Sequence, residues 1–191
     1  MMLRSGMLLY HGSYTPISKI DLDKCAVGKD FGKGFYLSDD LVQAKSFIPR
    51  AIQKALRNNL IPENIHRGYV SVFCYMDNDS SLPVYEFDSA NREWLWFVSL
   101  NRRESLASFL KEKVDPAALT APIIVGKIAN DTTNPTITAW LSGLYGPVNQ
   151  ERSADIAVEL LLPNRLKEQY CFRTQQAINC LTLKEVYTYD V

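Results

Sequence analysis

The sequence has no excess of charge of either sign, because its 21 lysines and arginines are balanced by 21 aspartates and glutamates. Proteins that bind long nucleic acids usually carry a basic surface, so we expect no strong nucleic-acid binding. Long hydrophobic runs are also lacking, since no stretch approaches the roughly 20 apolar residues of a membrane span. The apolar run before His11 is too short for a signal peptide. These features predict a soluble, cytoplasmic protein without a membrane partner.

Cysteine and histidine are scarce. The four cysteines are widely spaced and form no Cys-x-x-Cys pair, so neither a disulfide framework nor a zinc site is predicted. Of the two histidines, His66 lies in a polar stretch that is typical of a solvated loop. A histidine pair, a carboxylate cluster and a Gly-x-Ser-x-Gly motif are all missing, which argues against metallohydrolases and α/β-hydrolases. We therefore expect a protein that needs no metal.

The composition is that of an ordinary globular protein. With 191 residues, of which 47% are hydrophobic and 22% are charged, the chain is predicted to form one domain over residues 1–191. Because strands and helices mix without strict alternation, we predict an α+β fold. Strands are expected at 7–10, 35–37, 69–76, 84–87, 123–129, 169–173 and 183–189. Helices are expected from a cap at 38–40 to about 57, with a break or kink at Pro49, and at 91–113, 136–144, 153–161 and 174–181.

A glycine-rich loop, Lys29–Gly34, matches none of the common phosphate-binding loops. The Walker loop requires four residues between its first glycines, whereas three separate Gly28 from Gly32. Asp30-Phe31-Gly32 resembles the magnesium motif of protein kinases, but the accompanying His-Arg-Asp loop is missing from the sequence. We interpret Gly32 and Gly34 instead as positions where the backbone approaches a cofactor closely.

Two segments near the N-terminus carry the main functional signal. Leu9–Ser13 (LYHGS) and Phe31–Asp39 (FGKGFYLSD) resemble the ADP-ribosyltransferase superfamily, in the diphtheria-toxin-like and poly(ADP-ribose) polymerase branch with a His-Tyr-Glu signature. Through residues 94–102, 125–132 and 169–181 the rest of the chain is similar to a bacterial and phage family of uncharacterised members. The resemblance implies the ADP-ribosyltransferase fold, which has a split β-sheet core, flanking helices and an NAD cleft between its sheets. Taken alone, His11 would favour a structural role.

The resemblance implies a role for each matching residue. His11 would hydrogen-bond the adenosine-side ribose of NAD, the backbone of Gly12 would clamp the nicotinamide carboxamide, and Ser13 would bond in the same turn. Tyr36 and Phe47 would cover the two faces of the nicotinamide ring, since a flat cationic ring is attracted to aromatic side chains. Further NAD contacts are expected at Gly34, Phe35 and Asp131, although a plain turn and helix cap is the favoured interpretation of Asn130-Asp131.

The third position of the signature departs from the superfamily. A glutamate there binds a ribose hydroxyl and steadies positive charge, whereas this chain has Gln169. Glu168 is the alternative, although neighbouring strand residues point to opposite faces. The resemblance thus implies His11, Tyr36 and Gln169 as catalytic residues, and the glutamine argues against chain-building polymerase activity. Ala44 stands where polymerase members often place a hydroxyl that touches the carboxamide.

The predicted function is mono-ADP-ribosyl transfer from NAD to a macromolecular acceptor, expected to be a protein, with release of nicotinamide. Breaking the nicotinamide–ribose bond passes through an oxocarbenium-like sugar, as in glycoside hydrolysis. Two alternatives stay open at the same site: an NAD glycohydrolase that uses water as acceptor, and a catalytically silent module that binds NAD or ADP-ribose. A structural or interaction protein with a vestigial pocket is a third alternative.

Overall fold

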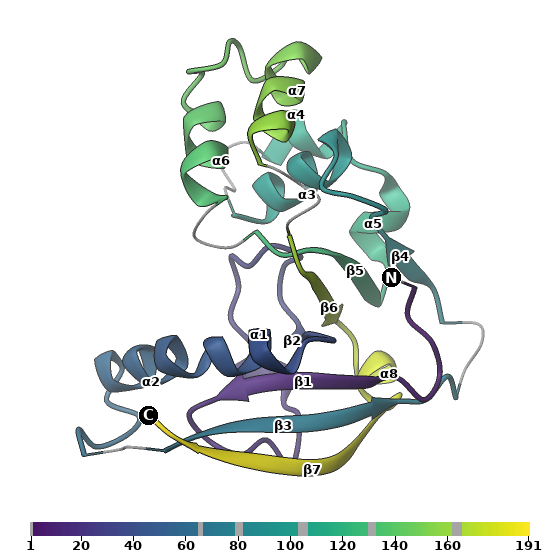
Figure 1. The fold of residues 1–191 in the computed structure, drawn as a ribbon. Helices are drawn as coiled ribbons and strands as arrows, with labels where there is room; N and C mark the ends of the chain where they lie inside the picture. The colour runs from purple at the N-terminus through teal and green to yellow at the C-terminus, as the bar shows by residue number, and fades with distance from the viewer. Residues whose placement is uncertain (1, 65–66, 79–81, 103–106, 130–132, 162–165) are drawn as a thin grey trace.

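A computed structural model describes residues 2–64, 67–78, 82–102, 107–129, 133–161 and 166–191, which form two β-sheets with helices around them (Figure 1). The first sheet has the strand order β1-β3-β7 and is antiparallel throughout, with bounds Leu8–Ser13, Arg67–Tyr75 and Leu181–Asp190. In the second sheet β4 pairs in parallel with β5 and the other neighbours are antiparallel. Its order is β2-β6-β5-β4, with bounds Phe35–Leu37, Glu168–Phe172, Ile123–Lys127 and Val84–Glu86. The α+β class is therefore confirmed.

Helices pack against both sheets. The helices α1 (Leu41–Ser46) and α2 (Ile48–Arg57) lie against the first sheet, where Ile48 and Ile52 contact Val70. Figure 1 shows α3, α4, α6 and α7 gathered beyond the second sheet, at the top of the view. Of the helices that the structure describes, none has the length and apolar character needed to cross a membrane. The remaining bounds are η1 Leu22–Lys24, α3 Arg92–Arg102, α4 Ala107–Lys111, α5 Pro116–Thr120, α6 Asn134–Leu141, α7 Glu151–Leu160 and α8 Gln175–Ile178.

Both faces of the second sheet are buried. Its face toward the first sheet contributes Phe35, Tyr170 and Phe172 to a core that includes Leu9. Its opposite face packs against the upper helices through a second core cluster that includes Phe31, Trp94, Phe97 and Trp140. A strand that is covered on both sides needs a nearly continuous apolar sequence, as in β5 (IIVGK) and most of β6 (EQYCF). Gln169 is therefore a polar exception that requires partners inside the protein.

Most predicted elements are confirmed, with ends shifted by a few residues. The helix expected to run to about residue 57 is split as Pro49 predicted, because proline stands in the first turn of α2, where no N–H is needed. Asp40 is the cap of α1, and its carboxylate accepts hydrogen bonds from the N–H groups of Val42 and Gln43.

The first predicted strand is wrong at its C-terminal end. The polar residues His11-Gly12-Ser13 were expected to form a turn, but they continue β1 and pair with Ser71, Val70 and Tyr69 of β3. Sheet pairing with β3 thus overrides the local turn composition. The short helices η1 and α5 were not predicted. The helix predicted at 91–113 corresponds to α3 and α4, with 103–106 outside the described residues.

Candidate functional site

Among the described residues, one backbone bridge joins β1 to the residue that follows β2. Tyr10 and Ser38 exchange backbone hydrogen bonds of 2.8 and 3.0 Å, which form an isolated bridge between the two sheets. The same register would next place Gly12 opposite Tyr36, but no second bridge joins these strands within the described residues. Residues two apart on a strand direct their backbone groups to the same edge. Gly12 and Tyr36 therefore both present N–H and C=O groups to the opening beyond the bridge, which we call the β1–β2 fork.

His11 reaches across this fork. Its Nδ1 lies 2.8 Å from the carbonyl oxygen of Tyr36, and since a carbonyl only accepts, Nδ1 carries the proton and Nε2 of the neutral ring keeps its lone pair. The imidazole also packs on Phe35, with ring centroids 4.5 Å apart. Burial lowers the pKa of His11 below its ordinary value, and the hydrogen bond to Tyr36 opposes this shift. The ring is thus a fixed, neutral acceptor.

Tyr36 ties the glycine-rich loop to the fork. Its hydroxyl donates to the carbonyl oxygen of Gly32 at 2.7 Å and accepts from the N–H of Phe31 at 2.9 Å. Burial is the main cause that raises the pKa of Tyr36 above its ordinary value. The ring lies alongside that of Phe31, with centroids 6.4 Å apart and an interplanar angle of 27°. Loop and aromatic residue therefore form one unit at the edge of the second sheet.

The glycines of the predicted site are already required by packing. A Cβ on Gly12 would lie 1.9 Å from the carbonyl oxygen of Ala44, so α1 approaches this strand as closely as glycine allows. A Cβ on Gly34 would lie 2.6 Å from the Sγ of Cys171. Gly32 has a φ of +80°, which side-chain-bearing residues rarely adopt. Close contact with protein atoms thus accounts for these positions without a cofactor.

The other predicted NAD contacts lie in different settings. Phe35 is buried between the sheets and touches the site through the His11 ring. Ser13 is buried, and its Oγ accepts the N–H of Thr15 at 3.5 Å. Phe47 is half-buried at the junction of α1 and α2, outside the three core clusters of the described chain. Asp131 lies outside the described residues.

Gln169 lies in a buried polar network. Its Nε2 donates to Asp30 Oδ2 at 3.0 Å and to the carbonyl oxygen of Lys127 at 3.3 Å. The other oxygen of Asp30 accepts Arg102 Nε at 2.9 Å and Arg102 Nη2 at 2.6 Å. The backbone N–H of Ala129 adds a bond of 3.0 Å to Asp30 Oδ2. Gln169 also shares a face of the second sheet with Tyr36. Tyr36 pairs with Cys171, which lies on the helix side, and Gln169 is two residues from Cys171 on the same strand, so its side chain points to that side too.

Glu168 points to the opposite face, as alternation along a strand predicts. Its carboxylate pairs with Lys127 Nζ and lines a hollow of about 550 Å³. In the same hollow Lys167 lies 2.9 Å from Asp40, and this pair lowers the pKa of Asp40 and raises that of Lys167. The remaining lining residues are Tyr10, Asp39, Leu41 and Leu166. Glu168 and Gln169 thus lie on opposite faces of the second sheet, Glu168 at this hollow and Gln169 in the buried network around Asp30.

Comparison with known proteins identifies the family. Residues 7–183 match the model of a family described as a protein of unknown function, DUF3990. The chain belongs to the DUF3990 family. No curated protein and no solved structure matches the chain. The DUF3990 match begins before β1 and ends inside β7, so it includes the fork, the glycine-rich loop and β6.

Asp30 and Arg102 are the site residues of this DUF3990 chain that sequence reasoning missed. Asp30 was considered only within a kinase-like motif, and Arg102 was considered as a contact to a phosphate or the acceptor or, at least as well, as the end of a solvated helix. Both are separated from Gln169 by long stretches of chain, since Asp30 and Gln169 are 139 positions apart. The available signal was an Asp in a glycine-rich loop next to an aromatic residue, which by itself specifies no partner.

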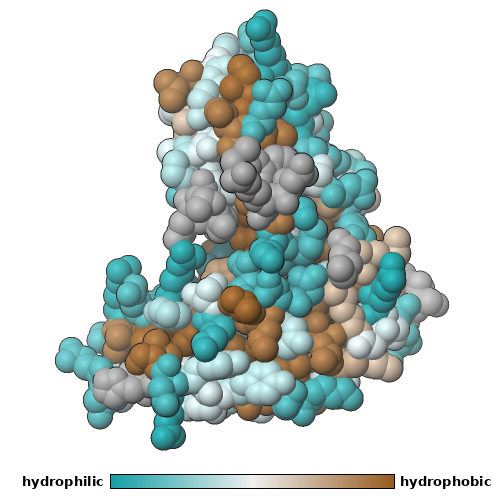
Figure 2. Space-filling model, in the orientation of Figure 1, coloured by the Kyte–Doolittle hydropathy of each residue, from teal (hydrophilic) through white to brown (hydrophobic). Residues whose placement is uncertain are grey.

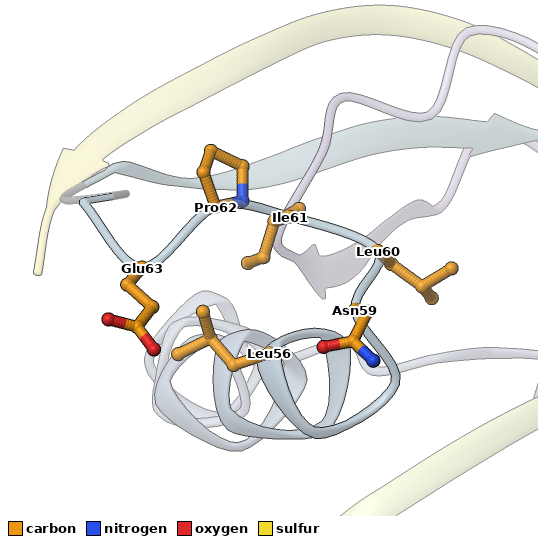
Figure 3. Close-up of a pocket in the computed structure, with 6 residues that line it drawn as sticks. All are labelled: Leu56, Asn59, Leu60, Ile61, Pro62 and Glu63. Carbon is orange, nitrogen blue, oxygen red and sulfur yellow. The ribbon is translucent and has the colours of Figure 1, made fainter.

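A second hollow of the DUF3990 chain lies at the end of α2, away from all predicted site residues (Figure 3). It measures about 620 Å³, and Asn59, with a φ of 53°, turns the chain there. Figure 2 shows apolar side chains over the lower left of the molecule, where α1 and α2 lie. The residues that line this second hollow are Leu56, Asn59, Leu60, Ile61, Pro62 and Glu63.

Among the described residues, no group of three or more His, Cys, Asp and Glu side chains is arranged to hold a metal ion.

Proposed function

We propose that this DUF3990 protein is an NAD-dependent mono-ADP-ribosyltransferase that transfers ADP-ribose to a macromolecular acceptor. The observation that carries the proposal is the β1–β2 fork, where His11 bonds across to Tyr36 and Gly12 presents its backbone to the same opening. A carboxamide-bearing aromatic ring such as nicotinamide needs a donor, an acceptor and an aromatic surface. Gly12 would supply the first two and Tyr36 the third. The division of the strands into two sheets supports an ADP-ribosyltransferase-type fold.

The proposed reaction breaks the bond between the nicotinamide nitrogen and C1′ of the ribose. The bonding pair leaves with nicotinamide, which becomes neutral, while C1′ develops oxocarbenium character. A nucleophilic atom of the acceptor, proposed to be a protein, then bonds to C1′ and loses its proton. Because the leaving group departs as a neutral molecule, the step requires no metal. Neutral His11 would accept a ribose hydroxyl at Nε2, and Gln169 would orient the other ribose.

The neutral amide of Gln169 favours a second candidate, a silent module that binds NAD or ADP-ribose. An amide positions a hydroxyl but stabilises developing positive charge less than a carboxylate does. Water in place of the acceptor would instead make the protein an NAD glycohydrolase. Adenine-labelled NAD separates the three outcomes: label in macromolecule indicates transfer, label in free ADP-ribose indicates hydrolysis, and intact NAD with saturable binding indicates the silent module.

Replacing His11 by alanine is expected to slow nicotinamide release by about 2- to 10-fold, the loss expected for a hydrogen bond between neutral groups worth about 0.5–1.5 kcal/mol. The measurement is nicotinamide release from NAD by the purified protein, with cell lysate as acceptor source. Lys24→Ala is a suitable control because that side chain is 85% exposed and lies outside the fork. Equal rates for wild type and His11→Ala would contradict the proposed role of the fork.

The lowered pKa of His11 predicts how NAD binding depends on pH. Because burial holds the pKa of His11 below the ordinary histidine value, the ring is neutral at neutral pH, and affinity is expected to be constant there. It should fall at lower pH, because the imidazolium has no lone pair on Nε2. Folding stability should decrease in the same direction, since the unfolded chain takes up the proton first. Calorimetric titration from neutral to acidic pH tests the prediction, and a loss of affinity centred above the ordinary pKa of histidine would contradict it.

A further inference from the structure

The amide orientation of Gln169 is determined by its partners. Asp30 Oδ2, at 3.0 Å, and the carbonyl oxygen of Lys127, at 3.3 Å, can only accept hydrogen bonds. The NH₂ group must therefore face both of them, which occupies its two protons and turns Oε1 the other way. An alternative amide flip would bring oxygen against oxygen at both contacts.

The amide oxygen of Gln169 lies outside the described hydrogen bonds of the network around Asp30. Gln169 is 7% exposed, and no hydrogen bond to Oε1 is formed by the described residues. The amide orientation set by Asp30 and Lys127 turns Oε1 away from these two acceptors. An oriented acceptor thus lies on the Tyr36 face of the second sheet.

We infer that Asp30 is a positioning residue for the proposed reaction: its carboxylate holds the Gln169 amide so that Oε1 accepts a ribose hydroxyl of NAD. This inference rests on the proposed function. Donation from Nε2 to a carboxylate polarises the amide and makes its oxygen a stronger acceptor. The pair Asp30–Gln169 would then take over part of the task that a glutamate performs in the superfamily.

The surroundings hold Asp30 in place for this task. Arg102 balances its charge through two donors on Oδ1, and Ala129 binds Oδ2 together with Gln169. Asp30 belongs to the loop whose next residues are bonded to the Tyr36 hydroxyl. The loop therefore couples the residue proposed to carry nicotinamide to the residue proposed to orient the ribose.

A charge exchange between positions 30 and 169 tests the inference. Asp30→Asn is expected to lower kcat for nicotinamide release by about tenfold, with a smaller change in KM. Gln169→Glu alone should also lower it, because two carboxylates then compete for one site. The double variant has a donor at 30 and a carboxylate at 169, with the same net charge beside Arg102. It should recover part of the kcat that the single variants lose, although the Lys127 carbonyl then faces an acceptor at 169. Asp23→Asn is the control, since that side chain is 98% exposed.

A second readout is independent of catalysis. The ¹⁵N–¹H signals of the Gln169 side-chain NH₂ group, assigned by their loss in Gln169→Glu, should shift in Asp30→Asn and stay unchanged in Asp23→Asn. Thermal unfolding of each variant shows whether a rate change is only a loss of folded protein. A structural role for Asp30 would lower stability without recovery of kcat in the double variant.

The outcomes separate this inference from the proposed function. An active wild type with an unchanged kcat in Asp30→Asn overturns the positioning role and leaves the proposed function standing. A wild type that releases no nicotinamide overturns the proposed function, and with it the positioning role of Asp30. The NMR signals then decide the contact itself: unchanged signals in Asp30→Asn show that Asp30 does not hold the amide.

Discussion

Replacing Arg102 by leucine is expected to lower the free energy of unfolding by about 3–5 kcal/mol, because the Asp30 carboxylate would stay buried without its counter-charge. Asp30 is 9% exposed, and Arg102 Nη2 lies 2.6 Å from its Oδ1. The same guanidinium donates to the carbonyl oxygen of Ala129 at 2.6 Å and to Asn134 Oδ1 at 3.1 Å. Its loss therefore also removes the bonds that join α3 to the chain after β5. Urea unfolding followed by circular dichroism measures the change.

Two matched variants make this measurement specific. Arg67 lies 4.0 Å from Asp190, and their side chains are 71% and 95% exposed, so Arg67→Leu should cost at most about 1 kcal/mol. Adding Asp30→Leu to Arg102→Leu removes the stranded charge and should recover part of the lost stability. Equal losses for Arg102→Leu and Arg67→Leu, or no recovery in the double variant, would show that the buried pair does not determine stability.

Replacing Gly12 by alanine is expected to cost about 3 kcal/mol of folding free energy, at the upper end of the usual range for overpacking. The new Cβ would lie 1.9 Å from the Ala44 carbonyl oxygen and 2.9 Å from its carbon. These are backbone atoms of α1, so no rotamer change relieves the contact, and the helix must move away from β1. Thermal and urea unfolding both measure the effect.

The same variant separates packing from cofactor binding at Gly12. Gly28→Ala is the control: no atom lies within 4 Å of its added Cβ, but its φ of +68° is strained, so it should cost only about 1–2 kcal/mol. If Gly12→Ala instead unfolds like the wild type and loses only NAD binding, the glycine serves the cofactor rather than the helix contact. Loss of stability before any loss of binding would assign it to packing.

For the candidate site, the sequence predicted which segments come together but not which residues contact Gln169. The segment around Gly12 and the segment around Tyr36 were expected to meet, and the fork brings them together through the Tyr10–Ser38 bridge. The surroundings of Gln169 were not predicted, because its partners Asp30 and Arg102 come from a loop and a helix end far away in the chain. A buried amide must have hydrogen-bond partners, but the local sequence does not identify them.

The sequence by itself determined the secondary structure classes, the break at Pro49 and the α+β mixture, because these follow from local periodicity, caps and proline geometry. It also determined that Glu168 and Gln169 face opposite sides of β6, since a strand alternates. Only the tertiary structure decided that His11–Ser13 are strand rather than turn, that Gly12 is pressed against α1, and that Asp30 holds Gln169. These features depend on pairing and packing between segments distant in the chain, and local preferences carry no information about such contacts.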